Sequence, residues 1–309
     1  MKIALPDMIS NSYFPAAAAV ELGFFREEGL DMSLELIFPV DKTYAALRDG
    51  QIDFVAGSAH SALSAFPQWD GVKLVCAQAQ GMYWFLVMHK DLGAKRGELD
   101  VVKGRNIGAA PWVEMGLRRL LIEAGYDLQR DAITIAPVPG AAPGGTAPVN
   151  FGLMAARALE ERKVDGFWAN GMGAEVAVRR GVGTIVLDVR RGDGPKQCFN
   201  YTMASIATSD KLIKESPDKV AAAVRAIVKT QQALKADVNR AAEAGRKLFP
   251  PSEAELIVEL IRRDLPYYDP SISPEFVAGM NQFSRDVGIL KGDVPYERVV
   301  ATQFLPGLI

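Results

Sequence analysis

Cysteine and histidine are scarce in this chain of 309 residues, which has two of each. Cys76 and Cys198 are too few for a disulfide framework, and their positions do not tell whether they pair. His60 and His89 have no cysteine or histidine at metal-ligand spacing beside them. We therefore expect neither a metal site nor a cofactor.

Long apolar runs and a bias of charge are also missing. No run approaches the roughly 20 apolar residues that span a bilayer. A net charge of −2 gives no electrostatic reason to expect nucleic acid or an anionic membrane as a partner. The chain opens directly on strand-like residues, without the basic segment and apolar stretch of an export signal. We expect either a periplasmic protein whose signal peptide has been removed or a cytoplasmic protein.

The composition itself is that of an ordinary globular protein, with 49% hydrophobic and 23% charged residues. Strand and helix patterns alternate over 2–58 and again over 106–169, and "LRDGQIDF" at 47–54 is echoed by "LEERKVDGF" at 159–167. The length suits two lobes better than one core. We predict an α/β fold of two lobes, each a mixed sheet flanked by helices, with a ligand cleft between them. Lobe I comprises residues 1–88 and 201–309, and lobe II comprises 89–200.

The last hundred residues are predicted to be largely helical. Ser216 followed by Pro217 indicates a capped helix that runs to about residue 237. Ser252 with Glu255 has the spacing of a capping box, and Ser273 precedes another helix start.

Two motifs in the first lobe are familiar. They are Ala-x-x-x-Gly-Phe-Phe-x-x-Glu-Gly-Leu-Asp at 19–31 and Leu-x-x-Gly-x-Ile-Asp-Phe-x-x-Gly-Ser at 47–58. The sequence resembles the solute-binding proteins of ABC importers in the nitrate, sulfonate, taurine and thiamine-precursor group. That resemblance implies the type II periplasmic-binding-protein fold and hinged lobes that close on a small molecule. It also implies a monomer, with the membrane subunits of an importer as partners if the protein is exported.

Candidate ligand-binding residues in the first lobe follow predicted strands, where ligands of open α/β sheets bind. They are Ser10, Asn11, Ser12 and Tyr13 after the first strand, and Ser58 and His60 after the third. The alternative for the first group is that Ser or Asn merely caps the next helix. Tyr83 and Trp84 lie by the predicted crossover, and as strand neighbours they should point to opposite faces, so that at most one meets the ligand.

Further candidates belong to the second lobe and to the return crossover. They are Trp112, Glu114, Asn150, Trp168, Asn170, Asn200 and Tyr201. In the anion-binding relatives that the chain resembles, the helix start near Trp112 carries Gly with Ser or Thr. Here Glu114 would repel an anion and attract a cation or N–H donors, although a carboxylate also stabilises a helix start through the macrodipole. The Gly- and Pro-rich segment 137–150 lacks the phosphate-loop pattern and is predicted to be a long loop.

We therefore expect a solute-binding protein for an aromatic or heterocyclic molecule, for example a pyrimidine-like precursor. The alternative is an enzyme on the same fold, similar to the pyrimidine synthase of thiamine biosynthesis or to the aromatic desulfinases. Tyr13 stands where the synthase has a reactive histidine, and the synthase's Cys-rich motif is missing. A desulfinase needs a nucleophilic thiol, for which Cys198 is the only credible candidate. No residue is assigned a catalytic role.

Overall fold

The computed structural model describes residues 1–141 and 150–305, and its chain divides into two compact units. The first unit combines Met1–Gly81 with Asn200–Ile309, and the second is Met82–Phe199. Most of the predicted long loop, residues 142–149, lies outside the described residues. No helix within 1–141 and 150–305 is long and apolar enough to span a bilayer.

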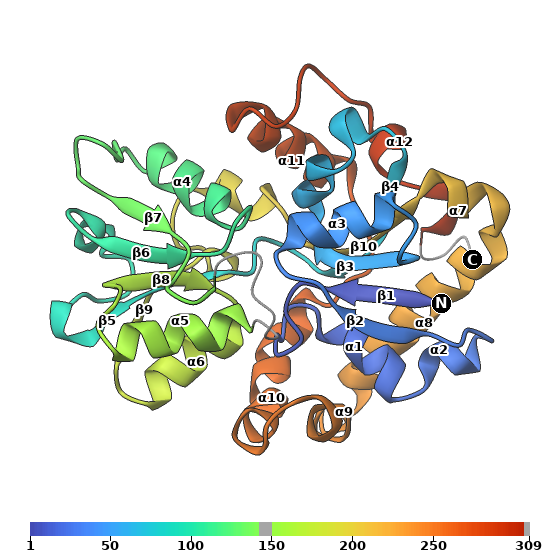
Figure 1. The fold of residues 1–309 in the computed structure, drawn as a ribbon, viewed down its shortest axis with the longest axis horizontal. Helices are drawn as coiled ribbons and strands as arrows, with labels where there is room; N and C mark the ends of the chain where they lie inside the picture. Colours follow the sequence, from blue (N-terminus) through green and yellow to red (C-terminus); the bar gives the residue numbers. More distant parts are fainter. Residues whose placement is uncertain (142–149, 306–309) are drawn as a thin grey trace. The chain divides into compact units, whose positions relative to one another are not determined.

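The first unit is built on a five-stranded mixed sheet in the order β2-β1-β3-β10-β4 (Figure 1). Its strands are β1 (Lys2–Leu5), β2 (Ser33–Leu36), β3 (Phe54–Ser58), β4 (Val72–Ala79) and β10 (Ala204–Ser209). The first three run parallel, whereas β10 is antiparallel to both β3 and β4. Every residue of β3 is buried, as expected for a central strand covered on both faces.

Nine α-helices of the described part accompany this sheet, with α3 on one face and α1 and α8 on the other (Figure 1). They are α1 (Phe14–Glu21), α2 (Phe24–Glu27), α3 (Val40–Arg48), α7 (Asp210–Glu215), α8 (Pro217–Ala236), α9 (Arg240–Leu248), α10 (Pro251–Asp264), α11 (Pro274–Asp286) and α12 (Tyr296–Val299).

The predicted helix starts are partly confirmed. Ser273 caps α11, with its hydroxyl accepting from the backbone N–H of Phe276 at 3.0 Å. α8 begins at Pro217 as expected, but the side chain of Ser216 makes no capping hydrogen bond. The capping box at Ser252 is wrong, because α10 has already begun at Pro251 and the Ser252 hydroxyl bonds to Glu253 instead.

The second unit contains another five-stranded mixed sheet, in the order β7-β6-β8-β5-β9. Its strands are β5 (Phe85–His89), β6 (Asn106–Ala109), β7 (Thr134–Ala136), β8 (Gly166–Ala169) and β9 (Gly183–Asp188). Helix α4 (Glu114–Glu123) covers one face, and α5 (Phe151–Glu160) and α6 (Gly171–Arg179) cover the other (Figure 1). β5 pairs with β8 and β9, so the second unit begins at Met82 rather than at residue 89. It ends at residue 199, one residue before the expected boundary.

The sequence echo between the two halves has a structural counterpart. Asp53 precedes β3, and its carboxylate accepts from the backbone N–H of Lys2 at 2.7 Å while its own N–H donates to the Lys2 carbonyl at 2.9 Å. Asp165 precedes β8 and makes the same two bonds with Asn106, both at 2.8 Å. Each aspartate therefore fixes the register of a central strand against its parallel neighbour.

Candidate functional site

The first-unit candidates gather at one edge of their sheet. β1 and β3 run parallel and β10 runs antiparallel to β3, so the segments after Leu5, after Ser58 and before Ala204 meet at the same edge. The predicted residues at this edge are Ser10, Asn11, Ser12, Tyr13, Ser58, His60, Asn200 and Tyr201. This is the carboxyl edge of the parallel strands, where open α/β sheets bind ligands.

The loop between β1 and α1 is fixed by its own polar groups rather than by a helix cap. The N-cap position is Tyr13, which makes no side-chain capping bond. Ser10 Oγ accepts from the backbone N–H of Ser12 at 3.1 Å, and Asn11 Nδ2 donates to Asp264 Oδ2 at 2.7 Å. Ser12 Oγ is buried and has no hydrogen-bond partner among the described residues. A buried hydroxyl without a hydrogen-bond partner destabilises the fold, and a ligand that bonds to Ser12 Oγ would remove this cost.

Ser58 and His60 lie at the junction of β3 with a 3-10 helix, η1 (Ala59–Ser64). Ser58 Oγ and Ser61 Oγ are 2.6 Å apart, and Ser61 Oγ is 3.5 Å from His60 Nε2. Tyr44 of α3 donates its hydroxyl to the Ser58 carbonyl at 3.0 Å. All of these side chains are buried, so this end of β3 is held rigidly.

Two aromatic rings pack beside His60. The edge of its imidazole meets Phe283 of α11 at a centroid distance of 5.4 Å, and Phe283 stacks on Tyr201 at 4.5 Å. Asn200 lies against the same helix, where a Cβ on Gly279 would come within 2.7 Å of the Asn200 Cβ. The sequence did not predict Asp264 and Phe283 as part of this edge, because their partners Asn11 and Tyr201 lie more than 80 residues away along the chain.

The second-unit candidates also lie along one edge. β6, β8 and β9 run in one direction and β5 runs against them, so the segments after Ala109, Ala169 and Asp188 meet the segment before Phe85. The predicted residues of this edge are Tyr83, Trp84, Trp112, Glu114, Trp168 and Asn170.

Three aromatic residues of this edge form a continuous buried cluster. The rings of Tyr83 and Trp84 are 4.7 Å apart, and those of Trp84 and Trp168 are 6.2 Å apart. Tyr83 and Trp84 precede β5 instead of lying in it, so the expectation that they point to opposite faces of a strand does not apply. Trp168 is fully buried, and its indole N–H has no hydrogen-bond partner among the described residues.

The start of α4 has an unusual backbone. Trp112 has a φ of +68°, a left-handed conformation that costs a non-glycine residue about 1–3 kcal/mol. Glu114 is the first residue of α4 and is half-buried, as is Trp112. Backbone strain of this kind clusters at ligand-binding sites, so Trp112 and Glu114 stay candidates for ligand contact.

The two asparagines of the second unit begin helices. Asn170 caps α6, with Oδ1 accepting from the Gly173 N–H at 3.2 Å, so part of its amide serves the helix. Helix α5 packs tightly against this cap, because a Cβ on Gly152 would come within 2.9 Å of the Asn170 amide. Asn150 precedes α5 without a side-chain capping bond, and its Oδ1 is buried.

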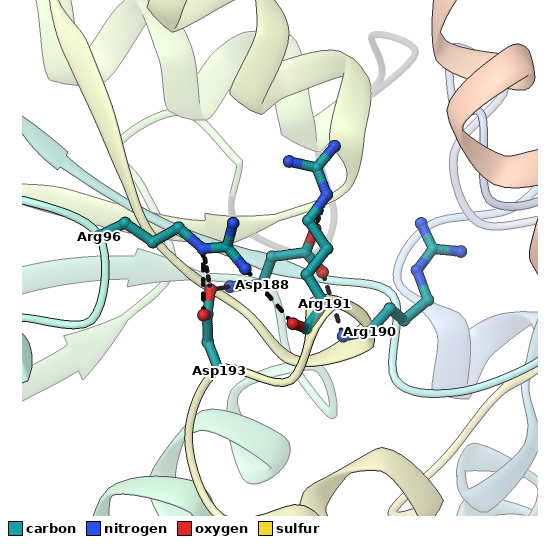
Figure 2. Close-up of polar contacts among 5 residues, drawn as sticks. All are labelled: Arg96, Asp188, Arg190, Arg191 and Asp193. Atoms are coloured by element: carbon teal, nitrogen blue, oxygen red, sulfur yellow. Dashed lines mark hydrogen bonds and ion pairs between the residues drawn. The ribbon is translucent and has the colours of Figure 1, made fainter.

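A charged cluster follows β9 that the sequence interpretation missed (Figure 2). Arg96 pairs with Asp193 at 2.8 Å, and Arg191 pairs with Asp188 at 3.3 Å. Asp188 Oδ1 also accepts from the Arg190 N–H at 3.1 Å, and Asp193 Oδ2 accepts from the Asp188 N–H at 2.8 Å. Burial raises the pKa of Asp188 above its usual range, and the charges of Arg190 and Arg191 partly offset that rise. The cluster fixes the turn that carries Arg190.

No group of three or more His, Cys, Asp and Glu side chains is arranged to hold a metal ion within the described ranges. The polar groups at the two edges are hydroxyls, amides, an imidazole, an indole N–H and the carboxylate of Glu114, and they lie beside aromatic rings. Such an edge can bind a small molecule through stacking and directed hydrogen bonds.

Two α/β units, each with a five-stranded mixed sheet flanked by helices, define the type II periplasmic-binding-protein fold, as predicted. The model of the family described as NMT1/THI5 like matches residues 11–241, and the chain belongs to that family. No curated protein matches it.

Several solved structures share the fold over nearly the whole chain. A protein from Bordetella bronchiseptica RB50 is 20% identical, with a TM-score of 0.73 over 96% of this chain and 91% of that one. The alkanesulfonate-binding protein SsuA from Xanthomonas axonopodis pv. citri, bound to MOPS, is 14% identical, with a TM-score of 0.70 over 97% of both chains. The desulfurization enzyme DSZB is 15% identical, with a TM-score of 0.64 over 98% of this chain and 97% of that one. At these identities the likeness establishes the fold.

Proposed function

We propose that this protein is a solute-binding protein that captures a small organic molecule for import by an ABC transporter. Its membership of the NMT1/THI5-like family and the fold shared with an alkanesulfonate-binding protein support this function. Its partners would then be the membrane subunits of the importer. Each unit has candidate binding residues at the carboxyl edge of its own sheet, such as Ser12 in the first unit and Trp168 in the second.

The ligand that fits these residues best is aromatic or heterocyclic, for example a pyrimidine-like molecule with N–H groups. The observation that carries this proposal is the buried cluster of Tyr83, Trp84 and Trp168, since flat rings bind to aromatic side chains by stacking. Glu114 at the start of α4 would attract an N–H donor and repel a small anion at that position.

A desulfinase-like reaction is the second candidate, because DSZB shares the fold. The burial of both cysteine thiols argues against a desulfinase-like reaction. Cys76 lies inside β4, and burial raises the pKa of its thiol, which disfavours the nucleophilic thiolate. Cys198 is also fully buried. Binding without chemistry therefore accounts better for the residues at the two edges.

A thermal-shift screen against pyrimidines, aromatic amines, aromatic acids, aliphatic sulfonates and nitrate tests the proposed function. A ligand at 100 times its dissociation constant adds about 2.7 kcal/mol to the free energy of unfolding, which raises the melting temperature by several degrees. We expect stabilisation by ring compounds and not by nitrate or small aliphatic sulfonates. Stabilisation by the small anions alone would contradict the proposed ligand class.

A further inference from the structure

Helix α1 begins at the carboxyl edge of the first sheet, directly after the loop that follows β1. Its first three residues are Phe14, Pro15 and Ala16. Backbone N–H groups at the start of a helix have no partner within the helix, and they form a ready binding site for an anion. The partners of these three positions therefore decide whether the first unit can hold an acidic group here.

None of these three positions has an N–H group left for a ligand. The Phe14 N–H donates to the Asn11 carbonyl at 3.4 Å. Pro15 has no backbone N–H at all. The Ala16 N–H donates to Oε1 of Gln78 at 3.2 Å. The positive end of α1 is thus closed by the chain itself.

Gln78 reaches this helix from a strand, 62 positions further along the chain. It is the second-last residue of β4 and is fully buried. Its Nε2 donates to the Ser205 carbonyl of β10 at 3.2 Å, which directs Oε1 toward Ala16. Gln231 of α8 donates to the Gln78 carbonyl at 2.8 Å and holds the end of β4. The acceptor of the Ala16 N–H is therefore fixed in place.

The loop before α1 offers a hydroxyl instead. Ser12 is 1% exposed, and its Oγ has no hydrogen-bond partner among the described residues. A hydroxyl can donate or accept a hydrogen bond, and it carries none of the positive charge of a helix N-terminus. Ser12 therefore suits a carbonyl, hydroxyl or N–H group of a ligand better than a carboxylate or a sulfonate.

We propose that Pro15 and Gln78 are specificity-determining residues that close the start of α1 to acidic groups, so that Ser12 binds a neutral polar group of the ligand. Pro15 withholds one N–H group, and Gln78 occupies the next. This inference rests on the proposed function and narrows its ligand class to rings whose polar group at the first unit carries no negative charge.

Two variants test the proposal by restoring one N–H group each to the start of α1. Gln78→Ala removes the acceptor of the Ala16 N–H, and Pro15→Ala adds an N–H at the preceding position. Gln231→Ala is the matched control, because it removes another buried glutamine amide beside the end of β4. It frees no helix N–H, since the Gln231 Oε1 accepts no hydrogen bond from the described residues.

The probes are two acids, each with a neutral partner of similar shape. They are methanesulfonate with dimethyl sulfone, and benzoate with benzamide. Each probe is titrated by calorimetry into the wild-type protein and the three variants. The readout is the affinity of the acid divided by that of its neutral partner, because a general loss of packing in a variant would weaken both members of a pair alike.

Gln78→Ala and Pro15→Ala should each shift this ratio toward the acid by at least about tenfold in at least one pair. A hydrogen bond between a restored N–H and a charged group has an effect of this size. Gln231→Ala should keep the ratio of the wild type. Pro15→Ala leaves the side chain of Gln78 in place, so it carries the test if Gln78→Ala fails to fold.

Two results would overturn the proposal while leaving the proposed function intact. One is that neither acid gains on its neutral partner in Gln78→Ala or in Pro15→Ala. The other is that Gln231→Ala shifts the ratio as far as these two variants do. The proposed function fails separately, if neither benzamide nor any ring compound of the thermal-shift screen binds the wild-type protein.

Discussion

The amide of Asn11 donates to the carboxylate of Asp264 at 2.7 Å, and both residues are almost fully buried. This bond joins the loop after β1 to the end of α10, across 253 positions of sequence. It fixes the amide of Asn11 with its nitrogen toward α10. This one contact gives a defined shape to the loop that carries Ser10 and Ser12, which are candidate ligand-binding residues.

Replacing Asp264 with Asn should therefore affect both stability and binding. A hydrogen bond to a charged group contributes about 1.5–3 kcal/mol, so we expect the free energy of unfolding to fall by an amount in that range. Ligand affinity should fall as well, because the loop of Ser10–Tyr13 loses its anchor. Urea unfolding and calorimetry measure the two effects. Unchanged affinity in a destabilised Asp264→Asn variant would show that the loop does not contact the ligand.

Trp168→Phe tests the aromatic cluster, and the chain offers a matched control. Trp69 is also a buried tryptophan whose indole N–H has no partner among the described residues, but it precedes β4, at the opposite edge of the first sheet. Each substitution should cost about 1–2 kcal/mol of stability through the smaller ring. Only Trp168→Phe should weaken binding, by at least about tenfold through a lost stacking and donor contact. Equal losses of affinity in the two variants would contradict a ligand role for Trp168.

Glu114→Gln removes a negative charge from the first turn of α4 and keeps the shape of the side chain. We expect weaker affinity for ligands that bear N–H donors, with a loss of stability of only about 0.3–1 kcal/mol from the helix dipole. The check is a calorimetric titration of the best ring compound from the thermal-shift screen. If the variant binds every ligand as the wild type does, Glu114 serves only the helix.

Glu28 predicts a pH dependence of stability. Its carboxylate pairs with Lys229 and with Arg225 of α8, the latter at 2.7 Å, and these two cations lower the pKa of Glu28. Ionised Glu28 therefore stabilises the folded chain, and this contribution is complete above about pH 5 and disappears as the pH falls through the lowered pKa. Glu28→Gln should reduce the free energy of unfolding at pH 7 by roughly 1–2 kcal/mol.

Urea unfolding at a series of pH values measures this effect. The difference between the wild type and Glu28→Gln should shrink as the pH falls through the lowered pKa of Glu28. Arg48→Met is a suitable control, because Arg48 pairs with Asp49 on the surface and its loss should cost little at any pH. A difference for Glu28→Gln that stays constant with pH would mean that the residue acts through packing alone.

The sequence revealed the repeated architecture because the signal is local. The segments that end in Asp53 and Asp165 carry the same pattern, and the structure gives both aspartates the same pair of backbone bonds. The switch of β5 to the second sheet was missed, since a buried apolar strand does not show which sheet it joins. The prediction of a capping box at Ser252 failed for a related reason, because the spacing of Ser252 and Glu255 does not show that the helix already begins at Pro251.

The candidate sites were predictable only in part. Residues directly after strands, such as Ser12 and His60, could be named from the order of elements along the chain. Their partners Asp264 and Phe283 come from late helices and are brought in by tertiary packing alone. Arg190 was missed because the sequence shows it as one of two adjacent arginines, and only the structure shows which of them is buried.

The most direct test of the account is mass spectrometry of the protein saturated with the best compound from the thermal-shift screen. The intact complex is weighed under native conditions, and the compound is then released by denaturation and weighed again. A solute-binding protein should hold one molecule per chain and release it with its mass unchanged after prolonged incubation. A released compound of altered mass would contradict the account and establish an enzyme on this fold.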